Sequence, residues 1–150
     1  MKFNLNVAKE NIIIGMEVAD KTSAINELIG HVSKTIRFNT TIVTKMLHNR
    51  EQKRSSGCGK QVAFVHLISA SIEERVIALA TLKTPLEWDS IDKKPVKIIG
   101  LVLDNPKFMP EYFETITRYA ELLANDTVRC SIISMNTVDQ IFTVIHNSQV

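Results

Sequence analysis

The residues best suited to chemistry lie between positions 50 and 66. His66 follows the apolar run QVAFV, which has the length of a strand, and Arg50 and a glycine-bearing loop with two serines precede it. A histidine at the end of a strand can hold its ring through one nitrogen and offer the other to a reacting atom. Fixed orientation of this kind is what nucleophilic or phosphoryl chemistry requires.

The loop at residues 54–59, RSSGCG, contains two of the five glycines in the chain. Glycine lets the backbone take positive φ angles or approach a ligand closely. Ser55, Ser56, Gly57 and Gly59 are equally compatible with a plain turn. The loop is not a GxxxxGK[ST] sequence, so nucleotide binding through that motif is not supported.

Two other interpretations of His66 are open at this point. The ring could simply end a strand with its nitrogens hydrogen-bonded, as most histidines outside active sites do. Alternatively, Cys58 could be a nucleophile with His66 as its base, although no third orienting group or oxyanion motif is recognisable. His31, His48 and His146 have settings typical of surface or satisfied histidines.

Apolar periodicity predicts two helices before the loop. Apolar residues recur at helical spacing over residues 20–36, with charged residues between them. A second helix is expected to begin at Asn39 or Thr40, either of which can cap free amides, and to run to about Glu51. These helices would place Arg50 close to the loop.

A strand-rich middle and further helices follow the loop. Three short apolar or β-branched runs have the length of buried strands, at residues 62–65, 76–82 and 96–103. Pro110 suits the first turn of a long helix, and two shorter helices are expected around residues 128–133 and 138–145. This order predicts one α/β domain over residues 1–150, with a mixed β-sheet flanked by helices.

Composition narrows the class of protein. The 150 residues suffice for one core, and the net charge of +2, from 18 basic and 16 acidic residues, is too balanced to hold nucleic acid by itself. Cys58 and Cys130 form no CxxC pair, so neither a disulfide framework nor a zinc site is indicated. Without a signal peptide or an apolar run of about 20 residues, a cytoplasmic protein with no membrane insertion is expected.

The segment NREQKRSSGCGKQVAFVH, residues 49–66, resembles the active-site stretch of the enzyme IIA domains of the phosphotransferase system, of the fructose and mannitol class, which includes the nitrogen-regulatory IIA proteins. That family typically reads RE, a short spacer, then STGIGxGIAIPH, and ends on the phosphorylated histidine. The matching positions are Arg50, Glu51, Ser56 in place of threonine, Gly57, Gly59, Ala63 and His66. Similarity extends from about residue 6 to residue 145.

The chain departs from the family pattern at several positions. Val65 replaces the proline before the histidine, and the small residue after it is Leu67; Gln61 and Arg54 replace glycines. The family's second histidine, expected at the start of the helix after Pro110, aligns with Tyr112. Since a phenol cannot carry positive charge whereas a histidine can, the resemblance implies slower phosphoryl transfer or transfer tuned to another partner.

The resemblance implies a phosphoryl carrier without cofactor or metal. His66 would accept the group, through its ε nitrogen, from a phosphohistidine carrier protein (HPr-like) and pass it to a IIB domain or a regulatory target. Arg50 would stabilise the phosphoryl charge, with hydrogen bonds from Ser55, Ser56 and the amides around Gly57 and Gly59, so replacing Arg50 should cost more than replacing either serine.

The alternative within the same family is a divergent regulatory module. Such a module would bind a partner protein, with weak or no phosphoryl transfer. Phosphorylation adds about two negative charges and could switch a docking site. The sugar specificity of any associated permease is not readable from a domain that contacts only proteins and a phosphoryl group.

Overall fold

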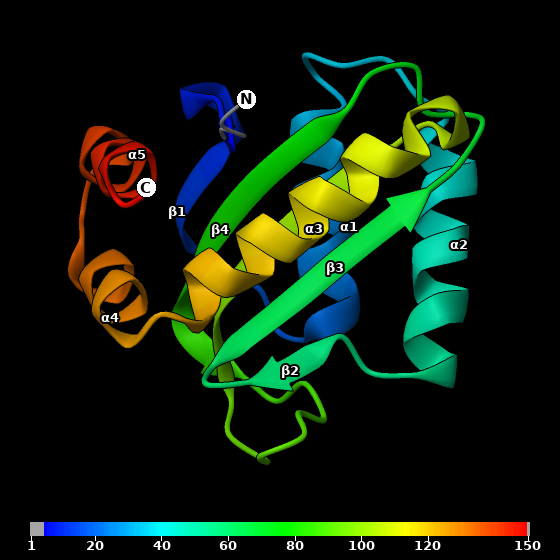
Figure 1. Cartoon of the computed structure of the whole chain (residues 1–150). Helices are drawn as coiled ribbons and strands as arrows, with labels where there is room; N and C mark the ends of the chain where they lie inside the picture. The colour runs from blue at the N-terminus through cyan, green and yellow to red at the C-terminus, as the bar shows by residue number, and fades with distance from the viewer. Residues whose placement is uncertain (1–4, 150) are drawn as a thin grey trace.

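The chain is described by a computed structural model over residues 5–149. Within them, one mixed sheet has the strand order β1-β4-β5-β3-β2 (Figure 1). The strands are β1 (Ile12–Met16), β2 (Gly57–Gly59), β3 (Val62–Ile68), β4 (Val76–Leu86) and β5 (Val96–Asp104). The central pair β4 and β5 is antiparallel, whereas β1 runs parallel to β4 and β3 runs parallel to β5.

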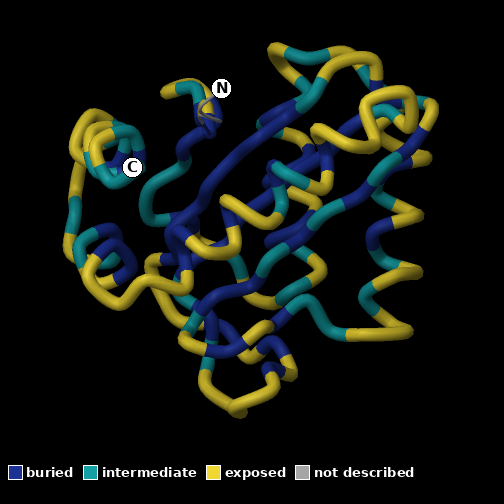
Figure 2. The backbone as a smooth tube through the Cα atoms, viewed as in Figure 1, coloured by how far each residue is buried: buried dark blue, intermediate teal, exposed yellow. Residues whose placement is uncertain are grey.

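Helices cover both faces of this sheet. They are α1 (Lys21–Val32), α2 (Thr40–Lys53), α3 (Met109–Ala124), α4 (Asp126–Ser134) and α5 (Val138–Asn147), with the 3-10 turns η1 (Lys9–Asn11) and η2 (Pro106–Phe108). One apolar core joins α1 and α2 to the sheet, and a second joins α3, α4 and α5 to the opposite face. Figure 2 shows the buried sheet between helices with exposed outer sides. The predicted α/β class, a mixed sheet flanked by helices, is confirmed.

Local capping explains where the first two helices begin and end. Asp20 accepts a hydrogen bond from the Ser23 amide, and Asn39 accepts one from the Ile42 amide. The second helix therefore begins where its predicted capping residue lies, and the first begins directly after Asp20. The first helix ends earlier than its apolar pattern suggests. The Ser33 hydroxyl bonds back to the Gly30 carbonyl, and α1 stops at Val32 because these polar groups compete with the helix.

Two strand predictions were incomplete, and two strands were missed. β3 continues two residues past His66, so the histidine lies within the strand and not at its tip, and β4 extends beyond residue 82 to Leu86. β1 is only five residues long and contains Gly15 at φ 65°, which hides its strand character. β2 falls within the predicted glycine loop, where residues 57–59 pair with β3.

The short length of β2 opens the edge of β3 near the histidine. β2 pairs with β3 only at Val62 and Ala63, and the Phe64 amide bonds to the Ser56 carbonyl. Past that point α2 lies beside β3, and its Val43 and Leu47 are buried in the first core (Figure 1). A side chain of α2 can therefore reach the second half of β3 around the sheet edge.

Candidate functional site

Three elements converge on His66. The residue lies on β3, opposite Val102 of β5, with its ring on the face covered by α3. Its Nδ1 is 2.7 Å from the hydroxyl oxygen of Tyr112 on α3 and 3.5 Å from Nη2 of Arg50 on α2. The fold thus brings Arg50 and Tyr112, which are 16 and 46 positions away in the chain, to the predicted acceptor His66.

The surroundings keep His66 neutral. Burial of the ring, with a smaller effect of the Arg50 charge, lowers the pKa of His66 from 6.5 to about 4. Burial likewise raises the pKa of Tyr112, against the opposing influence of Arg50. At neutral pH the site therefore holds an uncharged imidazole, an uncharged phenol and a cationic guanidinium.

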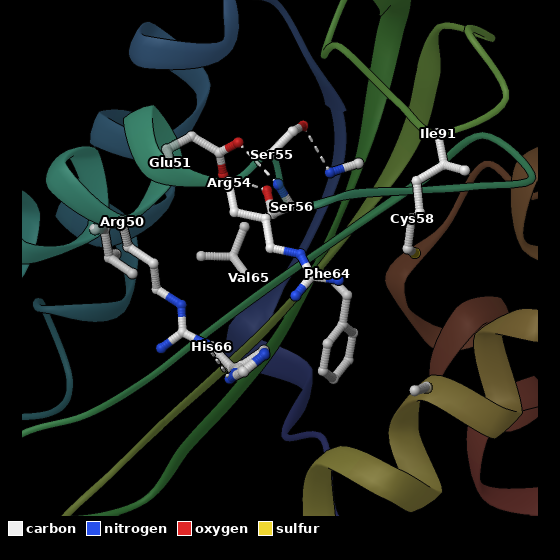
Figure 3. A pocket seen from close by; sticks show the side chains of 13 residues that line it. Arg50, Glu51, Arg54, Ser55, Ser56, Cys58, Phe64, Val65, His66 and Ile91 are labelled. Carbon is white, nitrogen blue, oxygen red and sulfur yellow. Dashed lines mark hydrogen bonds between the residues drawn. The ribbon is translucent and has the colours of Figure 1, made fainter.

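An open pocket of about 480 Å³ extends from His66 along the loop (Figure 3). Of the predicted loop residues, Ser55, Ser56 and Gly57 line it, whereas Gly59 does not. Phe64 and Ile91 form apolar parts of its wall. The cations that line it are the two guanidiniums of Arg50 and Arg54.

The two loop serines, which line the pocket, also take part in a hydrogen-bond network with Glu51 and Trp88. The carboxylate of Glu51 accepts from the Ser56 amide at 2.8 Å, from the Ser56 hydroxyl and from Lys21 Nζ at 3.1 Å. The Trp88 indole donates to Ser56 Oγ at 2.8 Å, and Ser55 Oγ donates to the Trp88 carbonyl at 2.6 Å. This network fixes the loop against the segment around Trp88.

The two loop glycines meet different structural needs. A Cβ on Gly57 would lie 2.4 Å from Ser90 Oγ and 2.9 Å from Ser90 Cα, so only glycine fits beside that backbone. Gly59 has φ 94°, which residues with a Cβ rarely adopt. Their roles as phosphoryl ligands, like those of the serine hydroxyls, remain predictions.

The cysteine hypothesis finds no electrostatic support. Desolvation of the Cys58 sulfur raises the pKa of the thiol, which is the reverse of what a nucleophilic thiolate needs. Its Sγ is 3.4 Å from the Val62 carbonyl oxygen. Cys58 lines the pocket that His66 also lines, but it forms no hydrogen bond with His66 within residues 5–149.

Arg54 is the pocket residue that sequence reasoning did not assign to the site. It was noted only as a departure from a glycine position. Figure 3 shows its side chain extending from the end of α2 into the pocket, from a different direction than that of Arg50. The available signal was a second arginine four residues after Arg50, in the loop that also carries the serines and glycines.

Neither a metal centre nor a membrane span is found in the described chain. Residues 5–149 contain no group of three or more His, Cys, Asp or Glu side chains arranged to hold a metal ion. No helix in the same stretch is both long enough and apolar enough to cross a bilayer.

Comparison with known protein families identifies the class to which this fold and site correspond. Residues 6–148 match the family described as "Phosphoenolpyruvate-dependent sugar phosphotransferase system, EIIA 2". The chain belongs to this family, as its resemblance in residues 49–66 implies.

Similar proteins fall into transport and regulatory groups. The chain is 24% identical to the fructose-specific EIIABC component of Bacillus subtilis over 97% of its own length but only 23% of that protein, so it spans about a quarter of this relative. It is also 24% identical to a nitrogen regulatory protein of Bradyrhizobium diazoefficiens, covering 93% of this chain and 91% of that protein.

Solved structures show the same fold. The nitrogen regulatory protein IIA-Ntr from Neisseria meningitidis superposes with a TM-score of 0.86 at 22% identity, over 93% of this chain and 95% of that one. The mannitol enzyme IIA of Escherichia coli, in a complex with phosphorylated enzyme IIB, superposes with a TM-score of 0.77 at 13% identity, over 95% and 98% of the two chains.

Proposed function

We propose that this chain is a cytoplasmic phosphoryl carrier that accepts a phosphoryl group on His66 from an HPr-like phosphohistidine protein and passes it to a IIB domain or a regulatory target. The observation that carries the proposal is the state of His66. Its ring is held through Nδ1, is kept neutral by burial, and makes no hydrogen bond through Nε2 within residues 5–149. An uncharged, oriented imidazole with one open nitrogen is what a phosphoryl acceptor requires.

The Tyr112 contact is compatible with Nε2 as the reactive nitrogen. The attacking nitrogen must present a lone pair, so the ring proton must be on the other nitrogen. When Nδ1 carries that proton, it donates to the Tyr112 oxygen 2.7 Å away, and Nε2 has the free lone pair. Tyr112 thereby orients the ring. Its hydroxyl can accept from or donate to Nδ1, so the contact is compatible with either tautomer, and the proposed transfer uses the one that carries its proton on Nδ1.

The transfer step exchanges one N–P bond for another. The Nε2 lone pair attacks phosphorus in the protonated phosphoimidazole of the donor, and the donor N–P bond breaks with its electron pair staying on the donor ring. The donor leaves as neutral imidazole, and His66 becomes the phosphoimidazolium, with its Nδ1 proton bonded to Tyr112. In a loose transition state charge spreads over the equatorial oxygens, so positioning and a nearby cation are the main contributions of the protein.

Arg50 is the residue best placed to supply positive charge beside the ring. Its guanidinium is 3.5 Å from Nδ1 and forms no ion pair within the described residues. A planar guanidinium can turn to phosphoryl oxygens and donate two parallel hydrogen bonds. Ser55, Ser56 and the amides of Gly57 and Gly59 would add hydrogen bonds, although both serine hydroxyls also serve the loop network.

The proposed donor and acceptor proteins are inferred from related proteins. One relative is a multiphosphoryl transfer protein, 26% identical over 93% of this chain and 17% of that protein, and one solved relative is an enzyme IIA bound to a phosphorylated enzyme IIB. A donor that carries phosphohistidine and an acceptor IIB domain would continue the same chemistry. Nucleic acid, a metal or an organic cofactor is not required for any step.

Labelling tests the proposal directly. The chain is incubated with phosphoenolpyruvate and the general phosphotransferase proteins, and label that is lost in acid but stable in base is measured. Wild type and His48→Gln should be labelled, whereas His66→Gln should not. Circular dichroism checks that His66→Gln is folded. Equal labelling of the wild type and a folded His66→Gln would disprove the assignment.

A regulatory function is the second candidate. The nitrogen regulatory protein of Bradyrhizobium diazoefficiens matches this chain over 91% of its own length, which favours a regulatory role of the same kind. In this case the phosphorylation state, or the unmodified surface, would control binding to a target protein. A folded wild type that takes no label but captures a partner protein would support the regulatory function over the carrier function.

A further inference from the structure

We propose that Arg54 is a second phosphoryl-binding cation, which faces the group bound to Nε2 while Arg50 lies on the Nδ1 side of the ring. The inference rests on the proposed function. It concerns a residue that stands at a glycine position of the family pattern and that the motif does not assign to the site.

The end of α2 directs Arg54 into the pocket. The helix ends at Lys53, and Arg54 turns to an extended conformation, with φ −158° and ψ 126°, while its amide still donates to the Arg50 carbonyl at 3.0 Å. This turn carries the Arg54 side chain away from the helix axis. In Figure 3 the two arginine side chains extend toward the pocket from different directions, with the His66 ring below them.

Arg54 has no partner of opposite charge in the described chain. The carboxylate that lines the pocket belongs to Glu51, and its oxygens already accept from Lys21 and Ser56. The Arg54 guanidinium makes no ion pair or hydrogen bond within residues 5–149. With no partner in the described chain, this guanidinium is available to an anion that enters the pocket.

The geometry at His66 leaves the Nε2 side to Arg54. Tyr112 and Arg50 both lie beside Nδ1, so Arg50 would have to turn to reach a dianionic group on the opposite nitrogen. Arg54 is the other cation lining the pocket. Its five N–H donors match phosphoryl oxygens, and a charge-assisted pair of this kind is stronger than a bond from a neutral donor.

A matched pair of charge-removing substitutions tests the inference. Arg54→Gln is compared with Lys53→Gln, which removes the same charge from the same helix end one residue earlier. The rate of transfer from the phosphorylated carrier protein and the hydrolytic lifetime of the labelled chain are measured. We expect Arg54→Gln to slow transfer about tenfold or more and to shorten the lifetime of the phosphohistidine. The effect on the rate should be smaller than that of removing a fully buried oxyanion donor, because this site is open to solvent. Lys53→Gln should stay within about twofold of wild type, because it contributes only a screened surface charge.

NMR of the arginine side chains adds a readout that altered folding would not mimic. On phosphorylation of the wild type, the Arg54 Nε–H resonance should shift with that of Arg50. Arg54→Gln with the same rate and lifetime as Lys53→Gln would overturn the inference while leaving the carrier function intact. A wild-type chain that takes no label would overturn both.

Discussion

The two sides of the pocket treat their polar groups in opposite ways. On one side, the carboxylate of Glu51 is enclosed by donors from Ser56 and Lys21, and Ser56 in turn accepts from the Trp88 indole. On the other side, the guanidiniums of Arg50 and Arg54 make no ion pair within residues 5–149. Arg50, Glu51 and Arg54 themselves lie within five residues, at the end of α2 and directly after it.

This difference distinguishes the residues that stabilise the loop from those that can act on a bound group. Fully paired polar groups stabilise one loop conformation, because each atom removed from water has a protein partner. Unpaired cations around a neutral imidazole stabilise little in the free chain, but they are available to an arriving anion. The hydrogen-bonded side around Glu51 therefore positions the pocket, and the side with the two arginines is where the proposed phosphoryl group would bind.

Removing a cation should damage transfer without damaging the fold. Arg50→Gln should slow phosphorylation of His66 by roughly ten- to a hundredfold, about 1.5 to 3 kcal/mol, because a charge-stabilising donor beside the ring is lost and the open site screens part of its effect. Its thermal unfolding should match that of Lys45→Gln, another substitution of an exposed cation on α2. A rate for Arg50→Gln equal to that of Lys45→Gln would remove Arg50 from the site, and Ser55→Ala should have a smaller effect than Arg50→Gln.

Disrupting the hydrogen-bond network around Glu51 should instead lower the stability of the fold. Glu51→Gln places an amide where the carboxylate accepts from three donor groups, so at least one buried donor loses its partner. We expect a loss of about 2 kcal/mol in the free energy of unfolding, seen as a drop of roughly 5 °C in Tm. Glu87→Gln, at an exposed neighbour of Trp88, is the control. If Glu51→Gln unfolds like the control, the network is not structural.

Tyr112 should have a smaller effect on transfer than Arg50, since its hydroxyl makes one hydrogen bond with the His66 ring. Tyr112→Phe keeps the aromatic packing beside Phe113 but removes the partner of Nδ1. The proportion of the tautomer with the proton on Nδ1 should fall, and transfer should slow by up to about tenfold, the value of one hydrogen bond. Nitrogen chemical shifts of His66 report the tautomer. An unchanged tautomer in Tyr112→Phe would mean that the hydroxyl only fills space.

Much of the fold was predictable because its signals are local. Capping residues mark the starts of α1 and α2, and apolar periodicity reveals α2, α3 and the cores of β3, β4 and β5. β1 and β2 were missed because glycine weakens the strand pattern in both, and their pairing depends on partners distant in the chain. His66 was placed at a strand tip because the pattern QVAFV stops before it, although pairing with β5 continues to Ile68.

The sequence indicated candidate residues for the site but not their contacts. The pattern around residues 49–66 indicates Arg50 and His66, and their 3.5 Å separation agrees with that expectation. The hydrogen bond of Tyr112 to Nδ1 and the direction of Arg54 depend on how α3 and the end of α2 pack against β3. Contacts between elements that are distant in the chain produce no recognisable spacing pattern in the sequence, so these two features could be seen only in the structure.

The last expected effect is a cost in stability, confined to acidic pH, that the neutral His66 ring imposes on the folded chain. The pKa of His66 is about 4 in the folded chain, against 6.5 for an ordinary histidine. Between these values the unfolded chain binds a proton that the folded chain does not, so stability falls as the pH is lowered from 6.5 to 4. Above pH 6.5 the ring is neutral in both states and has no such effect.

Thermal unfolding at pH 7 and pH 4.5 measures this cost as a difference between wild type and His66→Gln. The wild type should lose more stability on acidification, because the glutamine cannot take up the proton. Arg50→Gln should reduce the difference without abolishing it, since burial is the larger cause of the low pKa and the Arg50 charge the smaller. Parallel curves for wild type and His66→Gln would mean that the folded chain protonates the ring as readily as the unfolded one. In that case the pocket would be too hydrated to keep His66 ready as a neutral nucleophile in mildly acidic conditions.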